Sequence, residues 1–108
     1  ECFIVMEYMA KGSLHDCLYR SSSQASKQEF TWQKLGKKIL LDAARGLLYL
    51  HERSPPITHN DIKPHNVLVS AQNIGKLADM GLSREMANTL ASLKSVDGQT
   101  LEYAAPEI

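Results

Sequence analysis

Residues 31–51 carry the pattern that most restricts the fold of this chain. Apolar residues recur there every three or four positions, at Trp32, Leu35, Ile39, Ala43, Gly46, Leu47 and Leu50. This spacing predicts one apolar face of an α-helix, with Thr31 as its N-cap and Ser54-Pro55-Pro56 as its stop. About 21 residues would make a helix roughly 31 Å long. Three further leucines widen this face: Leu40, Leu41 and Leu48. We therefore expect the helix to be covered on more than one side.

Short extended segments flank this helix. Residues 2–9 (CFIVMEYM) are rich in β-branched and aromatic side chains and predict a strand. Gly12 then predicts a turn, and Ser13 predicts the cap of a short helix. After the long helix, residues 67–69 and 76–79 predict a β-hairpin closed by the AQNIG turn. Residues 82–102 lack periodicity and predict a long loop. Taken together, the predicted helices and strands indicate an α+β fold class that is mostly helical.

Length and charge exclude several classes of protein. The 108 residues suit one domain, with 44% hydrophobic and 22% charged side chains. Lys plus Arg (12) equals Asp plus Glu (12), so no basic field predicts a nucleic-acid partner. No apolar run has transmembrane length. Cys2 and Cys17 are the only cysteines, and their spacing allows either one disulfide or two reduced thiols in a reducing compartment.

The densest chemistry lies in residues 58–69, THNDIKPHNVLV. Acid, base and amide side chains alternate there before an abruptly apolar run. Two shorter motifs follow downstream, namely Asp79-Met80-Gly81 and Ala105-Pro106-Glu107. Thirteen positions separate Asn66 from Asp79, and 26 separate Asp79 from Ala105. The order and spacing of the three motifs constrain function more than any one of them alone.

Together these motifs resemble the catalytic core of eukaryotic protein kinases. Upstream, IVMEYMAKGSL resembles the fifth strand and hinge of that family, and LLDAARGLLYLHE resembles the helix before its catalytic loop. The resemblance spans essentially the whole chain and implies a partial kinase-like fold. It places the last β-lobe strand and hinge at 1–12 and the helices of the large lobe at 13–56. The catalytic loop, the hairpin and the metal-binding motif follow at 57–81, and the activation segment at 82–108.

The resemblance also implies an activity. It is that of an enzyme that transfers phosphate from ATP to Ser/Thr hydroxyls of a protein substrate, in the cytoplasm. Lys63, two residues after Asp61, and Thr100, before Ala-Pro-Glu, are similar to the serine/threonine type. The phrases GSLHDCL and LDAARGLLYLH are similar to tyrosine-kinase-like and plant-receptor-like members.

Each motif residue has an implied role. Asp61 would accept the substrate hydroxyl's hydrogen bond and later its proton. Lys63 would place a positive charge on the γ-phosphate. Asp79 and Asn66 would each ligate Mg²⁺, which prefers a few hard oxygen ligands. Phosphoryl transfer depends mainly on positioning and charge neutralisation, and these four side chains supply both.

The nucleotide contacts implied by the resemblance lie largely on the backbone. Met6 corresponds to the gatekeeper, and the Glu7 carbonyl and Met9 amide would face the adenine edge. Leu68 would lie under the ring. Plain core packing is the alternative for Met6 and Leu68, and the floor of a pocket is also core.

His59 has two interpretations. With Asp61 and His65 it could form a metal-dependent hydrolase site. We favour a structural role instead, with the ring packed against Met80 in a hydrophobic spine. The remaining histidines are interpreted as surface or loop residues: His15, His51 and His65.

Two positions depart from the kinase pattern. Asn60 stands where most relatives have an Arg that pairs with a phosphate on the activation loop, so we expect loop geometry here to be independent of that phosphate. Ser83, Thr89, Ser92, Ser95 and Thr100 remain candidate phosphosites, with solvation as their alternative. Met80 replaces Phe, a milder change because both side chains are large and apolar.

The 108 residues include no Gly-rich phosphate loop, no strand Lys and no partner Glu helix. The family uses these parts to hold the α- and β-phosphates. We therefore expect this piece alone to bind ATP weakly, to transfer no measurable phosphate and to expose apolar surface. The alternative function is a truncated or pseudokinase-like module that binds partners without catalysis.

Overall fold

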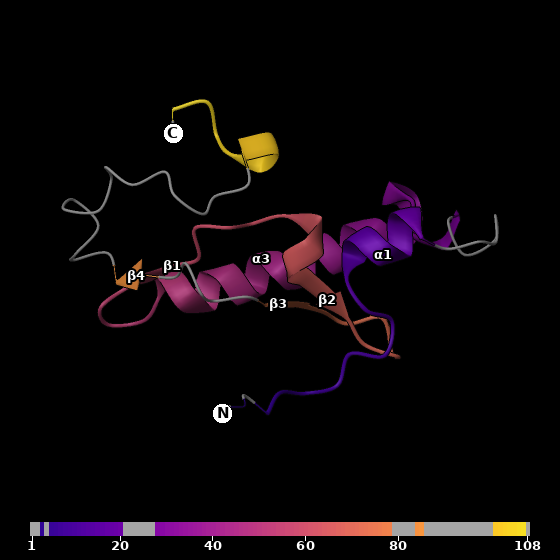
Figure 1. Ribbon diagram of the computed structural model, residues 1–108, viewed down its shortest axis with the longest axis horizontal. Helices are drawn as coiled ribbons and strands as arrows, with labels where there is room; N and C mark the ends of the chain where they lie inside the picture. Colours follow the sequence, from indigo (N-terminus) through magenta and orange to yellow (C-terminus); the bar gives the residue numbers. More distant parts are fainter. Residues whose placement is uncertain (1–2, 4, 21–27, 79–83, 86–100, 108) are drawn as a thin grey trace.

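The structure, a computed structural model, describes residues 3, 5–20, 28–78, 84–85 and 101–107. Its longest element is helix α3 (Lys37–His51), and a β-hairpin of β2 (Val67–Val69) and β3 (Gly75–Leu77) lies against it (Figure 1). Helix α1 (Leu14–Tyr19) lies toward one end of α3. The described chain thus layers one helix on one hairpin, consistent with the predicted α+β class.

Helix α1 begins as the sequence predicts. Ser13 is its N-cap: the Asp16 N–H donates to the Ser13 Oγ (3.1 Å), and the Ser13 N–H donates to the Asp16 Oδ2 (3.4 Å). Such reciprocal capping satisfies two backbone donors that the helix leaves unpaired. These hydrogen bonds with the Ser13 side chain and backbone lower the pKa of Asp16. Gly12, just before the cap, adopts a left-handed φ of 71°, which its missing Cβ permits.

The long helix begins later than predicted. Trp32–Gly36 form one wide π-helical turn, η1, in which Lys34 has non-helical dihedral angles (φ −109°, ψ −111°). The α-helix covers Lys37–His51, and the Thr31 side chain makes no capping hydrogen bond. A close backbone approach explains the kink: the Gly36 N–H donates to the Thr31 carbonyl (3.0 Å), and a Cβ on Gly36 would lie 2.8 Å from that oxygen. Thr31 does occupy the N-cap position, of η1 and with an extended backbone, but without a side-chain capping bond. The predicted C-terminal end is confirmed.

The predicted hairpin is confirmed. Strands β2 and β3 pair antiparallel, with Val67 opposite Leu77 and Val69 opposite Gly75. The connecting turn contains Asn73 at a left-handed φ of 62°, a conformation that Asn tolerates better than most residues. A Cβ on Gly75 would lie 2.9 Å from the Ile39 carbonyl oxygen. Glycine at this position therefore lets the hairpin approach α3 closely.

Strand β2 is also bonded along its other edge. The Lys11 N–H donates to the Val69 carbonyl (3.0 Å), and the Val69 N–H donates to the Gly12 carbonyl (2.8 Å). An antiparallel bridge joins Ser13 to Leu68. The segment after the predicted hinge is therefore fixed directly to the hairpin.

The strand predicted at residues 2–9 does not form among the described residues of that segment. Residues 3 and 5–9 have no strand partner in the described chain. Phe3 is 84% exposed and Val5 is 96% exposed. β-propensity favours an extended backbone, but a strand also needs a neighbour to accept and donate its backbone hydrogen bonds.

A second short sheet was not predicted. Strand β1 (Ile57–Thr58) pairs antiparallel with β4 (Arg84–Glu85). Two short 3₁₀ turns complete the described elements, η2 (Pro64–Asn66) and η5 (Leu101–Tyr103). Strand β4 lies within the segment predicted as loop, and its two-residue length leaves no periodicity to detect.

The core lies between α1, α3 and the hairpin. Its buried apolar residues are Leu14, Cys17, Phe30, Ile39, Ala43, Val67 and Val69. Cys17 is a free thiol whose pKa is raised by burial; Cys2 lies outside the described residues. The cover predicted on a second side of the helix is wrong for the described chain, because Leu40, Leu41 and Leu48 are 46%, 48% and 55% exposed. The exposed apolar surface expected of this piece is observed. Within the described ranges, no helix has the length and apolar character needed to cross a membrane.

Candidate functional site

His59 anchors the loop from residue 59 to residue 66, which we call the 59–66 loop. Its side chain is 1% exposed. Its Nε2 lies 2.8 Å from the Ala78 carbonyl oxygen, and the Asp61 N–H donates to its Nδ1 (3.2 Å). A carbonyl can only accept and an amide N–H can only donate, so these partners select the neutral tautomer with its proton on Nε2. The burial of His59 agrees with a structural role. Its predicted packing against Met80 stays a prediction, because Met80 lies outside the described residues.

Asn66 holds the Asp61 carboxylate in place. Its Nδ2 donates to the Asp61 backbone carbonyl (2.9 Å) and to the Asp61 Oδ2 (3.0 Å). Asn66 is buried at 6% exposure, and the Asp61 side chain is 9% exposed. Its amide nitrogen is committed to Asp61, so the amide oxygen is the atom of this side chain left to ligate a cation.

Lys63 completes a compact polar group with Asp61. The Lys63 Nζ lies 3.4 Å from the Asp61 Oδ2, and its side chain is 20% exposed. The Lys63 carbonyl accepts the Asn66 N–H (2.9 Å), which closes η2. The structure therefore brings together three of the predicted residues, Asp61, Lys63 and Asn66.

The residue that precedes the predicted metal-binding motif is bonded to this group. The Ala78 N–H donates to the Asn66 carbonyl (2.8 Å). Ala78 immediately precedes Asp79, so the described backbone ends one residue before the second predicted metal ligand. Asp79 and the predicted substrate-loop residue Thr100 lie outside the described residues, as do the candidate phosphosites from Ser83 to Ser95.

The predicted nucleotide residues are only partly brought together. Leu68 is half-buried in β2, and the Met9 carbonyl accepts the Gly12 N–H (3.0 Å) in a turn beside that strand. Met6, however, is 71% exposed. The Glu7 carboxylate forms an ion pair with Lys76 of β3.

Asn60 has a left-handed backbone, with φ at 69°. This region is costly for most L-residues and least so for Gly, Asn and Asp. The residue lies between His59 and Asp61, both of which are held by hydrogen bonds. The backbone conformation gives Asn60 a local reason for its side-chain type, one that the sequence alone did not reveal.

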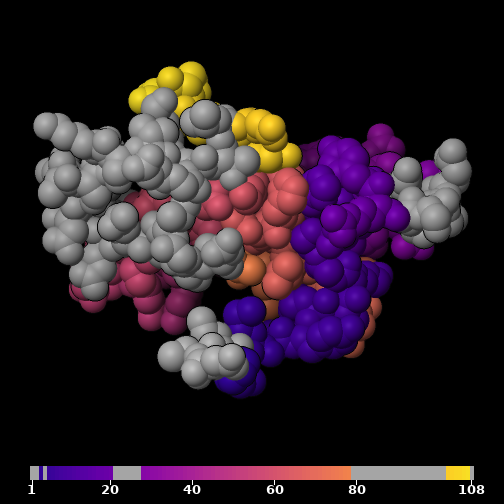
Figure 2. All heavy atoms as spheres, viewed as in Figure 1, coloured from indigo at the N-terminus to yellow at the C-terminus, as the bar shows by residue number. Residues whose placement is uncertain are grey.

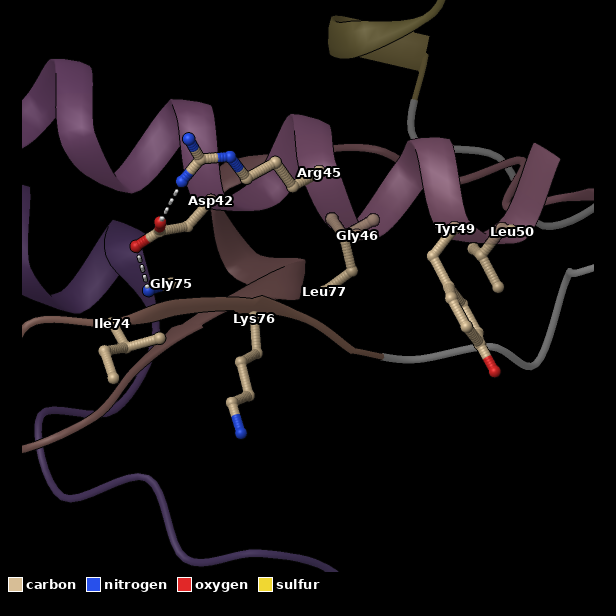
Figure 3. A pocket seen from close by; sticks show the side chains of 9 residues that line it. All are labelled: Asp42, Arg45, Gly46, Tyr49, Leu50, Ile74, Gly75, Lys76 and Leu77. Atoms are coloured by element: carbon tan, nitrogen blue, oxygen red, sulfur yellow. Dashed lines mark hydrogen bonds and ion pairs between the residues drawn. The ribbon is translucent and has the colours of Figure 1, made fainter. Parts of the chain in front are cut away.

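A separate groove of about 450 Å³ lies between α3 and β3 (Figure 3). It is lined by Asp42, Arg45, Gly46, Tyr49, Leu50, Ile74, Gly75, Lys76 and Leu77. None of the predicted site residues lines this groove, so it is not the predicted nucleotide site.

Asp42 is the main electrostatic link at one end of this groove. Its carboxylate accepts hydrogen bonds from the Lys38 Nζ (2.7 Å) and the Gly75 N–H (3.0 Å). Arg45 lies 3.9 Å away. Desolvation of the carboxylate acts to raise the pKa of Asp42, but the hydrogen bonds from Lys38 and Gly75 and the nearby charges outweigh it and lower that pKa. Asp42 thereby joins α3 to the hairpin.

The hydrolase interpretation of His59, Asp61 and His65 is not supported by this geometry. Both ring nitrogens of His59 are already paired with the protein backbone. Across the part of the chain that the structure describes, no group of three or more His, Cys, Asp or Glu side chains could hold a metal ion. What the 59–66 loop does present is a carboxylate, an ammonium group and an amide, and the oxygen atoms among these suit Mg²⁺ better than a softer metal.

The 59–66 loop is accessible in space. In Figure 2 its salmon-coloured surface lies between the violet atoms of α1 and the yellow atoms of residues 101–107. Within this loop Ile62 and His65 are exposed, whereas the Asp61 side chain is only 9% exposed.

Comparisons with known proteins place this geometry in context. A family model described as "Protein kinase domain" matches residues 1–108. The chain is 41% identical over 105 residues to the serine/threonine-protein kinase CTR1 of Arabidopsis thaliana, covering 97% of this chain and 12% of that protein.

Two further relatives agree. The probable LRR receptor-like serine/threonine-protein kinase RPK1 of the same plant is 37% identical over 108 residues, covering 99% of this chain and 19% of its own length. A putative mitogen-activated protein kinase kinase kinase 7-like protein of Drosophila melanogaster is 38% identical over 106 residues. The match covers 97% of this chain and 25% of that protein. The chain thus spans a quarter or less of the length of each of these relatives.

Proposed function

This chain belongs to the protein kinase family, and on that premise we propose that it supplies the catalytic loop of an enzyme that transfers phosphate from ATP to Ser/Thr hydroxyls of a protein. The observation that carries the proposal is the Asp61–Lys63–Asn66 group, in which both neighbours contact one carboxylate oxygen. Phosphoryl transfer needs such a positioned acceptor and a nearby cation more than it needs covalent chemistry. The names of the relatives support the serine/threonine type.

In this proposal Asp61 accepts the hydrogen bond of the incoming hydroxyl and takes its proton late in the transfer. The Asn66 amide fixes the carboxylate, so little reorientation is needed when the substrate arrives. The Lys63 ammonium group moves away from Asp61 to contact the γ-phosphate. There it acts as a point positive charge. The neutral His59 ring keeps the backbone of Asp61 fixed during both events.

ATP is used with Mg²⁺ in this family, and the donor set here fits that ion. Asn66 and Asp79 would hold Mg²⁺, which would neutralise charge on the phosphates. The amide orientation supports this assignment for Asn66, because its nitrogen is turned to Asp61. The Ala78–Asn66 hydrogen bond holds the residue that precedes Asp79 against the backbone of Asn66.

For the nucleotide base we propose the backbone of Glu7 and Met9 at the adenine edge, Met6 as gatekeeper and Leu68 beneath the ring. The turn at Met9 and strand β2 are already joined through Lys11 and Gly12, which supports the pairing of Met9 with Leu68. We place Thr100 in the substrate loop, bonded to Asp61 and Lys63.

The test is Asp61→Asn in the complete kinase domain, with transfer of labelled phosphate to a generic protein substrate as the measurement. We expect kcat to fall by about 10²- to 10⁴-fold, because the general base is lost while the shape is kept. Glu52→Gln, an exposed acidic residue just after α3, is the matched control and should leave kcat unchanged. Full activity in Asp61→Asn would refute the proposal and leave a partner-binding module as the function.

A second proposal concerns Asn60. We propose that the geometry of the 59–66 loop does not depend on phosphorylation of the activation segment. Its support is that Asp61 is held from three directions, by His59, Lys63 and Asn66. A neutral, short side chain at position 60 cannot form the phosphate pair that an Arg would form.

Phosphatase treatment tests this idea. We expect the wild-type domain to keep its activity after dephosphorylation, and Asn60→Arg to become newly dependent on phosphate. A wild-type domain that loses activity on dephosphorylation would show the proposal to be wrong. A thermal-unfolding control is needed for Asn60→Arg, because Arg is less suited than Asn to the left-handed backbone at this position.

We also propose that the 108 residues alone do not transfer phosphate, since they contain no Gly-rich phosphate loop. Phosphorylation of a generic substrate by the isolated chain, abolished by Asp61→Asn, would overturn this. Weak ATP binding without transfer is the expected result.

A further inference from the structure

Three rings from distant parts of the sequence meet beside the 59–66 loop. The His15 ring of α1 stacks on the His65 ring of η2, with centroids 3.9 Å apart and planes inclined by 20°. Tyr103 of η5 meets His65 nearly edge-on, with centroids 6.2 Å apart and an angle of 69°. We call His15, His65 and Tyr103 the ring cluster. The exposure of His65 agrees with its predicted surface or loop position, and His15 is half-buried on α1. Nothing in the spacing of the two histidines indicates this contact.

His65 is the central member of the ring cluster, and its position in the chain matters. It lies in η2 between Pro64 and Asn66, and Asn66 is the residue that holds Asp61. A three-residue 3₁₀ turn is closed by few hydrogen bonds, here the Asn66 N–H to the Lys63 carbonyl (2.9 Å) and the Val67 N–H to the Pro64 carbonyl. With so few backbone bonds of its own, the turn also depends on what its side chains pack against.

We propose that His65 is a positioning residue for phosphoryl transfer. Its ring fixes η2 between α1 and η5, and through Asn66 this fixes the Asp61 carboxylate. The ring cluster also connects residues 101–103 to the 59–66 loop, so the placement of η5 bears on the reacting group. This inference rests on the proposed kinase function, and it requires a flat ring at position 65, not an ionisable one.

The charges around the ring cluster are compatible with this role. His15 also packs against Tyr19, with ring centroids 4.8 Å apart, and its neighbour Asp16 is committed to the cap at Ser13 and to Arg20. Both outer rings are therefore attached to their own elements: His15 to α1 and Tyr103 to η5. Removing the central ring should loosen η2 without unfolding either helix.

The experiment compares His65→Ala with His65→Phe in the complete kinase domain. We expect His65→Ala to lower kcat by about 3- to 30-fold, since small misplacement of a reacting group is costly, while KM for ATP changes less than about 2-fold. His65→Phe keeps a flat ring and should retain at least about half of the kcat. His51→Ala removes an exposed histidine from the last turn of α3 and should behave as wild type.

Two outcomes would overturn the positioning role in an active wild type: full kcat in His65→Ala, or a loss in His65→Phe as large as in His65→Ala. A wild type with no transferase activity would overturn the proposed function and this role with it. The thermal midpoints of His15→Ala, His65→Ala and the double variant test the ring cluster without using activity. We expect the double variant to shift Tm by less than the sum of the single shifts; additive shifts would overturn the contact itself.

Discussion

Two short segments of this chain have nearly the same β-propensity, but only one of them forms a paired, buried strand. Val69 lies in VLV of β2 and is 0% exposed, whereas Val5 lies in FIVMEYM and is 96% exposed. Strand β2 has bonded neighbours on both edges, the β3 strand and the backbone around Gly12. Residues 5–9 have none in the described chain. Side-chain type therefore indicates a possible strand, but the strand forms only where a neighbouring backbone can pair with it.

The same difference divides the candidate site. The residues of the 59–66 loop contact one another and Ala78, just after the hairpin, through partly buried hydrogen bonds. Met6, predicted to border the nucleotide, lies on the exposed segment. The chemistry of the loop is thus pre-positioned by its partners, and the variants below test how far this paired region differs from the exposed one.

The largest effect is expected for His59→Leu. This change leaves the Ala78 carbonyl and the Asp61 N–H without their ring partner. An unsatisfied buried polar group costs about 1–3 kcal/mol, so two should lower the free energy of unfolding by roughly 2–6 kcal/mol. Chemical denaturation measures the loss, and His51→Leu on the exposed end of α3 is the control. A loss under about 1 kcal/mol would break the claim that buried pairing holds the loop.

Val69→Ala and Val5→Ala test the opening comparison directly. Removing two buried methyl groups from Val69 should cost about 2–3 kcal/mol in unfolding free energy, through lost burial and the cavity left behind. The same change at exposed Val5 should alter it by less than about 0.5 kcal/mol. Equal losses at the two positions, measured by urea denaturation, would show that residue 5 is buried in solution and would contradict the contrast.

Gly75→Ala and Gly46→Ala form a second matched pair. The new Cβ at Gly75 would lie 2.9 Å from the Ile39 carbonyl oxygen, so we expect a loss of about 1–3 kcal/mol. At Gly46 the nearest atom is Leu77 Cδ1 at 3.6 Å, an ordinary contact. There the change should gain up to about 1 kcal/mol from helix propensity. Opposite signs in thermal unfolding would support the close packing of hairpin on helix, and equal signs would refute it.

The smallest effect is expected for Asp42→Asn, which weakens the ion pair with Lys38 in the same helix and the hydrogen bond from the Gly75 N–H of the hairpin. We expect a loss of about 1 kcal/mol at neutral pH. The pKa of Asp42 is lowered by folding, so the unfolded chain takes up the proton first as pH falls. The wild-type advantage should be complete above the ordinary Asp pKa of about 3.9 and disappear as pH falls through the lower folded pKa. An advantage that persists at the lowest pH would contradict the assigned charge pairing.

Features that depend on neighbours in sequence could be predicted. The Ser13 cap follows from Ser and Asp three residues apart, and the hairpin follows from two β-branched runs around a turn. The end of α3 follows from the Ser-Pro-Pro stretch. Within the site, the grouping of Asp61, Lys63 and Asn66 follows from the family motif, because the spacing itself encodes the loop.

Features that depend on distant backbone could not be predicted. The kink before α3 arises from Gly36 approaching the Thr31 carbonyl, whereas the periodic pattern runs across it without interruption. Strands β1 and β4 each have two residues and pair across 26 positions, from Thr58 to Arg84. The contact between His15 and His65 joins residues 50 positions apart. None of these leaves a local signature in the sequence.

The double bonding of β2 has a consequence for how the chain opens. The amide of Lys11 is bonded to Val69, and the amide of Val69 is bonded to Gly12. Hydrogen–deuterium exchange at either amide therefore requires the same separation of segment from strand. These two amides should therefore exchange at similar rates. A molecule that holds the segment in place should slow exchange at both amides together. Exchange in the exposed residues 5–8 should change much less.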